Sequence, residues 1–492
     1  MAVERELKLT AGPGFHLPDL SGIDPGVHAS VADAVRMETT YHDTADLRLA
    51  RWRCSLRYRS KEGWTLKLPL PPTGEILERN EIQFSGPART PPAAARQLVR
   101  AYLRGGRLEP VARLSTLRHR VRLTGEDGTP LAEVVDDEVS VLAGRRVAAR
   151  FREIEVELAN GDRSLLKAVE KRLVAAGAEP SDQTPKLVRA LGSRASEPPE
   201  VAPAPLAKRP AAGQLVANAI SAALAELFVN DPGVRLGSDP EAVHKARVGV
   251  RTLRSHLRTF ARLLEGDPLR FEQLRELGSR LGEVRDREVL LELLRGKAAG
   301  LPAADQRAAG EMLGRLEAEL QAARTQLADF MDSDAYLDLL ESLVRFAQAP
   351  AFNELAELPA AQVAVELARR PWRRLRKAVQ ALPESPEPGQ LHQVRILAKR
   401  TRYAAEAVAP VVGKRAERFA EAAAALQGVL GEYHDAITAE SWLRSAAGTG
   451  RRAFVAGELA AAVRARGEWM RSRWPAAWDS LNRKRLREWF NR

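Results

Sequence analysis

Charged and apolar side chains alternate in several short segments near the start of the chain. In VERELKL (3–9), Glu4, Glu6 and Lys8 share one face, because successive side chains of a strand point to opposite sides. REIEVEL (152–158) places Glu153, Glu155 and Glu157 on one face in the same way. Further segments with this pattern contribute basic or mixed faces: Arg57, Arg59, Lys67, Arg79, Glu81, Arg118, Arg120 and Arg122.

These charged faces have two interpretations. They form the hydrated outside of a sheet, or they line a cavity that holds cations and anions together. Three neighbouring carboxylates on one strand face repel each other by several tenths of a kcal/mol or more. A divalent cation between them relieves this repulsion, and such hard cations prefer oxygen ligands.

The segments that carry these residues predict a barrel. Gly and Pro clusters separate candidate strands, and a helix near 162–176 can be capped by Asp162 or Ser164. The strands are expected at 3–9, 35–41, 55–60, 63–68, 78–84, 117–124, 131–142 and 150–158. Eight mostly antiparallel strands with one or two helices suggest an eight-stranded antiparallel barrel.

The rest of the chain predicts a different architecture. Residues 193–212 are rich in Pro and Ala and are typical of a semi-rigid linker between a domain at 1–192 and one at 213–492. The second domain has helical periodicity and an internal duplication. HKARVGVRTLR recurs as HQVRILAKRTR (from 244 to 392), and LGEVRD recurs as LGEYHD (from 281 to 430). We therefore predict an α+β multidomain protein whose second domain has two related helical bundles, about 213–350 and 360–492.

Composition limits the class of protein. The 492 residues carry a net charge of +12, which favours a polyanionic partner. The single cysteine, Cys54, excludes an intramolecular disulfide framework and fits a reducing cytoplasm. The charged start lacks the apolar core of a signal peptide, and the most apolar stretch carries Asn218 and Glu226, so no membrane partner is expected.

The first domain resembles the CYTH family, the triphosphate tunnel metalloenzymes. Glu4-x-Glu6-x-Lys8 matches the ExExK signature, and YHDT (41–44), LRYR (56–59), WTLK (64–67), RNE (79–81), Asp136, EIEVEL and Lys186 follow in order. Pro185-Lys186 stands where the family usually has Ser-Lys. The resemblance implies a tunnel with Mg²⁺ or Mn²⁺ as cofactor. Its implied metal ligands are Glu4, Glu6, Asp136, Glu155 and Glu157; its catalytic residues are Glu4, Glu6, Lys8, Glu155 and Glu157; its phosphate-binding residues are Lys8, Arg57, Arg59, Lys67, Arg79, Arg118, Arg120 and Lys186.

The second domain carries basic stripes. His244, Arg247, Arg251, Arg254 and Arg258 step by three or four residues, which is one face of a helix. No acidic residue interrupts this stripe, so it calls for a polyanion. The two copies resemble the CHAD family, which implies binding of inorganic polyphosphate. The implied binding residues are the five above with Arg285, Arg373, Arg374, Lys377, His392, Arg395, Lys399, Arg402 and His434.

Some assignments keep alternatives. Asp137 competes with Asp136, because one register slip reverses the face of a strand. Lys67 fits an outer face as well as the tunnel. The histidines fit metal ligands as well as phosphate-binding groups, and the arginines at 373–374 with Lys377 fit an exposed face.

The expected function is metal-dependent hydrolysis of inorganic triphosphate in the first domain, with polyphosphate binding in the second. The alternatives are an organic triphosphate as substrate (thiamine triphosphate, or ATP for hydrolysis or cyclisation) and a non-catalytic protein that binds polyphosphate. Nucleic acid is not expected, because aromatic residues make up only 5% of the chain and none interleaves the stripes. A cytoplasmic location, in association with polyphosphate granules, follows from these expectations.

Overall fold

A computed structural model describes residues 2–60, 62–69, 77–181, 184–267 and 271–491, with the backbone alone at 2–6 and 77–79. The chain divides into two compact units, Met1–Pro199 and Glu200–Arg492. The boundary falls inside the segment expected to be a linker.

The N-terminal unit is an antiparallel barrel. Eight strands follow one another in the order β5-β4-β3-β2-β6-β7-β8-β1, and pairing of β5 with β1 closes the ring. The bounds are β1 (Ala2–Thr10), β2 (His28–Asp43), β3 (Ser55–Arg59), β4 (Gly63–Pro69), β5 (Leu77–Phe84), β6 (Glu109–Thr124), β7 (Pro130–Ala143) and β8 (Arg146–Leu158). A two-residue strand, β9 (Glu179–Pro180), adds to β1 and brings the sheet to nine strands. The predicted barrel is confirmed, with this short ninth strand as an addition.

Two strands are much longer than the sequence pattern predicted. β2 and β6 each have 16 residues and pair along nearly their whole length. The register between them shifts between Ala32 and Val35, which is a local irregularity that breaks the alternation of side chains. Much of the first half of β2 is exposed, so it lacks the apolar periodicity by which a strand is recognised.

Apolar clusters cover one side of the barrel and fill one end. α4 (Arg163–Ala175) packs Leu165, Val169 and Leu173 against the outer faces of β1, β6, β7 and β8. Asp162 caps this helix by accepting the N–H groups of the two residues after Arg163. A second cluster joins Tyr41, Leu47, Ala50, Ala112, Leu114, Val139, Val141, Ala195 and Leu187. Since Leu187 belongs to α5 (Lys186–Leu191), this helix closes the barrel end where the cluster lies.

Shorter helices complete the unit. Indole and phenol rings of Trp52 and Tyr102 stack at 5.2 Å between ring centres, and Trp64 is fully buried. The remaining helices of this unit are α1 (Arg48–Arg51), α2 (Ala93–Leu98), α3 (Arg100–Leu103) and η1 (Ser193–Ser196).

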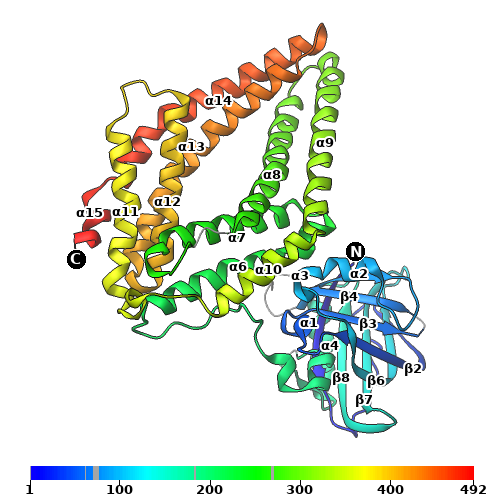
Figure 1. The fold of residues 1–492 in the computed structure, drawn as a ribbon. Helices are drawn as coiled ribbons and strands as arrows, with labels where there is room; N and C mark the ends of the chain where they lie inside the picture. Colours follow the sequence, from blue (N-terminus) through cyan, green and yellow to red (C-terminus); the bar gives the residue numbers. More distant parts are fainter. Residues whose placement is uncertain (1, 61, 70–76, 182–183, 268–270, 492) are drawn as a thin grey trace. The chain divides into compact units, whose positions relative to one another are not determined.

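The C-terminal unit is all-helical, as predicted (Figure 1). The main helices are α6 (Ala212–Leu236), α7 (Pro240–Thr259), α8 (Glu272–Ala298), α9 (Ala303–Met331), α10 (Asp334–Gln348), α11 (Ala360–Gln380), α12 (Pro388–Val412), α13 (Lys414–Ala446) and α14 (Arg451–Leu481). Short segments are η2 (Ala261–Leu263), η3 (Glu354–Glu357), α15 (Lys484–Arg487) and η4 (Glu488–Asn491). The duplicated motifs fall on equivalent helices, α7 with α8 and α12 with α13. α6 alone among the described helices is long and apolar enough to cross a membrane, and 56% of its most apolar window is buried inside the protein.

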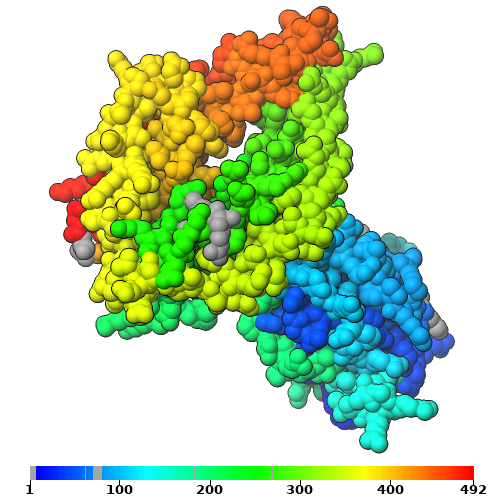
Figure 2. Space-filling view, in the orientation of Figure 1, coloured from blue at the N-terminus to red at the C-terminus, as the bar shows by residue number. Residues whose placement is uncertain are grey.

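Two long helical hairpins meet at their ends within this unit. α8 with α9 and α13 with α14 extend away from α6 and α7 (Figure 1). Arg451 at the start of α14 forms an ion pair with Asp305 of α9, and the indole N–H of Trp442 donates to Glu319 of α9 at 3.1 Å. Figure 2 shows an opening between the green α8 and the orange α13–α14 hairpin, so side chains do not fill the space that the hairpins enclose.

Candidate functional sites

The register of four adjacent strands places the charged residues of the barrel in rows. Directly paired residues share a face, so each row follows one level of the barrel across β1, β8, β7 and β6. The first row is Glu6, Glu157, Glu133 and Arg122; the second is Lys8, Glu155, Val135 and Arg120; the third is Thr10, Glu153, Asp137 and Arg118. The rows therefore progress from acidic to mixed charge along the barrel.

The second and third rows form a buried network with Lys186 of α5. The Lys186 ammonium lies 2.6 Å from Asp137 Oδ2, 2.8 Å from Glu155 Oε2 and 3.2 Å from Glu153 Oε1. Lys8 donates to Glu155 at 2.6 Å and to Glu153 at 3.3 Å. These side chains are at most 8% exposed, so the network lies in the interior.

Arg118 completes the network by binding both oxygens of Asp137, at 2.8 and 2.7 Å. Three cations then face three carboxylates: Lys8, Arg118 and Lys186 against Asp137, Glu153 and Glu155. The formal charges of these six groups cancel, and Arg189 lies farther off, with its Nε 3.9 Å from Glu153 Oε2. Such a balance is what buried charges require, because an unpaired ion is costly to remove from water.

The pKa values in the network differ with the surroundings of each carboxyl. Although burial opposes ionisation, Lys186 and Lys8 hold the pKa of Glu155 well below its usual value. Burial raises the pKa of Glu153 despite the same two lysines. Glu153 Oε2 accepts no hydrogen bond from the described residues, which agrees with a weaker stabilisation of its charged form.

The opposite wall contributes further cations. Arg59 is buried, with its Nε donating to the Thr39 hydroxyl and an Nη atom to Glu62 at 3.0 Å. Lys67 lies 3.1 Å from Glu81, so it points into the barrel and its alternative outer-face position is wrong. Arg57 lies 3.9 Å from the same carboxylate.

The charged groups around the Tyr41 hydroxyl show that the basic residues face a shared interior. Burial alone raises the pKa of this hydroxyl, but four surrounding cations hold the pKa below its usual value. Arg57, Arg59 and Lys67 come from β3 and β4, and Lys186 comes from α5. Burial, and then Arg57 and Arg118, lower the pKa of Arg59, so Arg118 of the facing β6 shares the same interior. The charged faces therefore line a cavity rather than the hydrated outside of the sheet.

The acidic first row fits a divalent cation. Glu157 lies directly between Glu6 and Glu133 of the neighbouring strands, and like charges in this position destabilise a sheet unless a cation separates them. Carboxylate oxygens are ligands that Mg²⁺ and Mn²⁺ accept. Among the residues with described side chains, no group of three potential ligands is preassembled. The side chains of Glu4, Glu6 and Arg79 lie outside the described residues, although pairing of Glu4 with Arg79 and of Glu6 with Glu157 is described for the backbone.

One predicted ligand faces away from the cavity. Asp136 is bound through both oxygens by Arg152, at 2.8 and 2.7 Å, on the opposite side of β7 from Asp137. The assignment of Asp136 to metal is therefore corrected, and Asp137 is the interior residue. Two further carboxylates belong to the site. The sequence placed Glu153 on the inward face but gave it no role, and Glu62 lies in the turn between β3 and β4. The alternation in REIEVEL already indicates Glu153, whereas nothing in the sequence marks Glu62.

A second site lies in the C-terminal unit, where helices of both repeats converge. A cavity of about 240 Å³ is lined by residues of α7, α8, α12 and α13. Its charged or imidazole-bearing residues are His244, Arg247, Arg251, Arg285, Asp286, Arg395, His434 and Asp435. We call this set, with Lys399 of α12, the basic cluster.

The glycines of the duplicated LGE motifs explain how the arginines fit. A Cβ at Gly282 would lie 3.5 Å from Arg247 Nη2, and one at Gly431 would lie 3.7 Å from Arg395 Nε. In each repeat the guanidinium group therefore lies over a helix surface that lacks a side chain. Arg247 also pairs with Asp286 at 2.9 Å, so this aspartate orients an arginine.

Two histidines of the basic cluster have pKa values below the usual value for histidine. Burial, and then Arg285, lowers the pKa of His244; burial, and then Arg395, lowers that of His434. The rings of His392 and His434 lie 4.5 Å apart. Because arginines surround these histidines, the arrangement favours binding of anions over binding of a metal cation.

Other residues of the predicted stripes lie outside the lining of this cavity. Arg402 pairs with Glu406 at 2.7 Å, and Arg258 is exposed. Arg254 lies near Gly278 of α8, where a Cβ would be 3.4 Å from its Nη1. Three further residues are exposed on α11: Arg373, Arg374 and Lys377.

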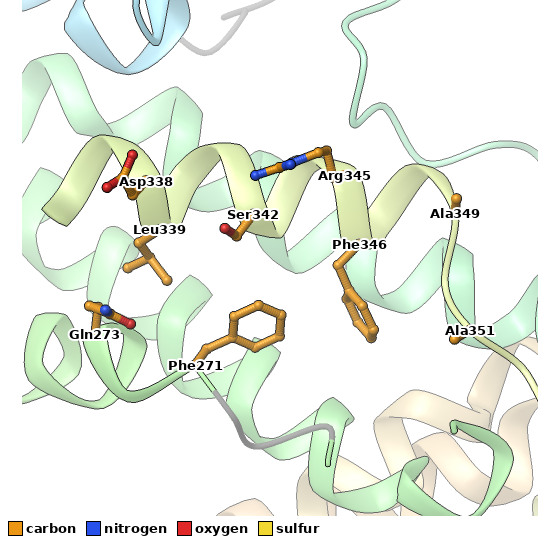
Figure 3. A pocket seen from close by; sticks show the side chains of 9 residues that line it. All are labelled: Phe271, Gln273, Asp338, Leu339, Ser342, Arg345, Phe346, Ala349 and Ala351. Carbon is orange, nitrogen blue, oxygen red and sulfur yellow. The ribbon is translucent and has the colours of Figure 1, made fainter. Parts of the chain in front are cut away.

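A separate cavity in the same unit has a different character. It measures about 470 Å³ and lies between the start of α8 and α10 (Figure 3). Phe271 and Phe346 contact each other edge to face at 5.5 Å, and its charged residues, Asp338 and Arg345, have opposite signs. It lacks the concentration of cations that distinguishes the basic cluster.

Comparisons with known proteins agree with this division. The CYTH domain model matches residues 2–186, and the CHAD domain model matches residues 218–444. Uncharacterized protein Rv2226 of Mycobacterium tuberculosis (strain ATCC 25618 / H37Rv) is 31% identical over 459 residues, which are 87% of this chain and 85% of that protein.

Solved structures also resemble parts of the chain. PptA from Streptomyces chartreusis is 26% identical and covers 55% of this chain and 99% of its own, with a TM-score of 0.45. The CHAD domain from the plant Ricinus communis is 24% identical and covers 57% of this chain and 95% of its own, with a TM-score of 0.49. From the domain matches and the full-length relative, the chain belongs to the family of proteins in which a CYTH domain is followed by a CHAD domain.

Proposed function

We propose that the N-terminal barrel hydrolyses inorganic triphosphate with Mg²⁺ or Mn²⁺, and that the C-terminal unit binds inorganic polyphosphate. CYTH domains are tunnel metalloenzymes that act on triphosphates. The observation that carries the proposal is the convergence of cations from opposite barrel walls beside an acidic row. That combination suits a polyanion that is handled together with a metal ion.

The basic residues of the barrel bind the phosphate groups of the substrate. Arg57, Arg59 and Lys67 on one wall, with Arg118 and Arg120 on the other, surround the phosphate oxygens from both sides. Arg120 supports this role because its Nε is buried and has no hydrogen-bond partner among the described residues. Planar guanidinium groups bind two phosphate oxygens at once, which fixes the orientation of the chain.

The carboxylates serve a second purpose. Glu157, with Glu4 and Glu6, would hold the divalent cation, since the backbone of Glu6 is paired directly with that of Glu157 and Glu4 lies two residues earlier in β1. When bound, the cation neutralises charge on the phosphate oxygens and acidifies a water molecule. Lys8 and Lys186 are fixed by Glu153 and Glu155, so their positions are set before a substrate enters.

The basic cluster supports polyphosphate binding by its excess of unsatisfied donors. The Nε atoms of Arg251 and Arg395 are buried without a hydrogen-bond partner among the described residues. Buried polar groups are normally satisfied, so an anion is the partner that these donors need. Arg373, Arg374 and Lys377, which are exposed on α11, are proposed as further polyphosphate-binding residues. A cytoplasmic location at polyphosphate granules follows from this activity.

The experiment is a substrate panel with the full-length protein. Phosphate release from tripolyphosphate, ATP, thiamine triphosphate and long-chain polyphosphate is measured with Mg²⁺ or Mn²⁺ and after chelation. We expect tripolyphosphate to be the preferred substrate and Glu4→Ala to abolish turnover. Glu138→Gln is the control, because Glu138 is half-exposed and contacts Arg152 on the outer side of β7. Binding of polyphosphate without turnover under any metal would replace the enzyme by a binding protein, and preference for ATP or thiamine triphosphate would replace the substrate.

A further inference from the structure

The basic cluster contains an amine in an unusual place. Lys399 lies in the middle of α12, between Arg395 and Arg402 of the same stripe, and α12 packs against α7. α7 presents its own basic stripe, with Arg247, Arg251 and Arg254. The two repeats thus bring one ammonium group into a field of guanidinium groups.

Four arginines dominate the electrostatic surroundings of Lys399: Arg251, Arg395, Arg247 and Arg254. Three come from α7 and one from α12. The neighbouring helices add His434 and Asp435 from α13, and Arg285 and Asp286 from α8, at the cavity. Asp286 is engaged by Arg247, and burial raises the pKa of Asp435. The sequence provides no acidic residue on α7 after Glu241 or on α12 before Glu406.

Arginine and lysine respond differently to surrounding positive charge. A guanidinium group stays charged in a protein, so the arginines cannot relieve their mutual repulsion by losing a proton. An ammonium group can, and lysine pKa values shift readily on burial. Burial, and then the surrounding arginines, lower the pKa of Lys399 to about 7. In the free protein this amine is therefore largely neutral above neutral pH.

We propose that the basic cluster binds its polyanion together with a proton, and that Lys399 is the residue that takes up the proton. The inference rests on the proposed polyphosphate binding and specifies how that binding is regulated. A bound phosphate chain neutralises the arginines and places anionic oxygens beside the amine. The ammonium form is then favoured again, so the affinity falls as the pH rises above neutrality.

The size of the effect follows from thermodynamic linkage. If the bound anion returns the amine to an ordinary lysine pKa near 10.4, the affinity for polyphosphate falls about eightfold between pH 7.5 and pH 8.5. At pH 8 each binding event takes up about 0.9 proton, because most of the free amine is then neutral. The histidines contribute little in this window, since the pKa values of His244 and His434 lie below the usual 6.5.

The decisive variant is Lys399→Arg, which keeps a cation in place but cannot lose its proton. Affinity of the full-length protein for long-chain polyphosphate is measured by titration calorimetry from pH 7.5 to 8.5. Ionic strength is fixed and a chelator suppresses hydrolysis. We expect the wild type to show the eightfold loss and Lys399→Arg to bind with nearly constant affinity. Lys297→Arg, an exposed lysine near the end of α8, serves as the matched control and keeps the wild-type pH dependence.

A second readout needs no variant. The binding enthalpy of the wild type at pH 8 is compared in buffers with different ionisation enthalpies, which gives the number of protons taken up directly. Binding with no proton uptake, or equal pH profiles for wild type and Lys399→Arg, overturns the role of Lys399 and leaves polyphosphate binding intact. Absence of binding at every pH overturns the proposed function itself.

Discussion

Replacement of Lys186 by methionine tests the charge balance inside the barrel. The ammonium group contacts three carboxylates within 3.2 Å, and all these side chains are at most 8% exposed. Without it, the three carboxylates face Lys8 and Arg118 at close range, with Arg189 farther off at 3.9 Å from Glu153. Removing one partner of a buried ion pair costs roughly 3–5 kcal/mol, because the remaining charge is left uncompensated. We expect Lys186→Met to lower the free energy of unfolding of the barrel by this amount.

A second substitution distinguishes charge balance from simple loss of contacts. Glu153→Gln alone leaves an excess cation, whereas Glu153→Gln combined with Lys186→Met leaves two carboxylates and two cations. At 3.2 Å and an effective dielectric constant near 20, the attraction between Lys186 and Glu153 is about 5 kcal/mol before desolvation is subtracted. The double variant should therefore be more stable than the sum of the single effects predicts, by roughly 2 kcal/mol or more.

The assay is amide hydrogen exchange in β7 and β8 of the full-length protein, since these strands hold Asp137, Glu153 and Glu155. Arg122→Met is the control, because Arg122 is 61% exposed and its pair with Glu133 should contribute less than about 1 kcal/mol. Additive effects of the two single substitutions, within about 0.5 kcal/mol, would refute the idea that the network acts as one balanced unit.

Three further predictions concern separate parts of the molecule. Burial lowers the pKa of His256 to about 4, so its neutral form stabilises the fold above pH 6.5 and this contribution is lost as the pH falls towards 4. The loss is about 3 kcal/mol, and denaturation of wild type and His256→Phe at both pH values should show it only in the wild type. Gly282→Leu should displace Arg247 and weaken polyphosphate binding about tenfold in a filter assay, with hydrolysis unchanged, whereas Gly310→Leu at a glycine with free space around it should not. Glu157→Gln should reduce tripolyphosphate hydrolysis about 100-fold or more with unchanged circular dichroism, and an undiminished rate at low Mn²⁺ would remove this residue from the metal site.

The sequence predicted the barrel interior well because strand periodicity is strict. Once Glu155 and Lys8 are known to face inward, every second residue of their strands must do so as well. The sequence could not decide between Asp136 and Asp137. The two aspartates are adjacent after Val134 and Val135, so one of them must face inward and the other outward, and only the pairing of Arg118 with Asp137 shows which one is inside. The turn residue Glu62 could not be predicted at all, since its role depends on the position of Arg59.

The C-terminal unit shows a different limit of prediction. The duplication indicated that Arg247 and Arg395 are equivalent, and their nearly equal spacings to the glycines of the LGE motifs (35 and 36 residues) fit the positions over which they lie. The sequence contains no information on which stripe faces which. The environment of Lys399 depends on the packing of α7 against α12, two helices separated by more than a hundred residues. Long-range contacts of this kind arise from tertiary packing rather than from local pattern.

The contact between the hairpin ends has a topological consequence. Because Arg451 meets Asp305 and Trp442 meets Glu319, the C-terminal unit forms a closed frame around the opening in Figure 2. A linear polymer that passes through a closed frame can leave it only lengthwise, end first. Sideways escape requires the contacts between the two hairpins to break, so the residence time of a threaded chain would depend on its length as well as on its charge.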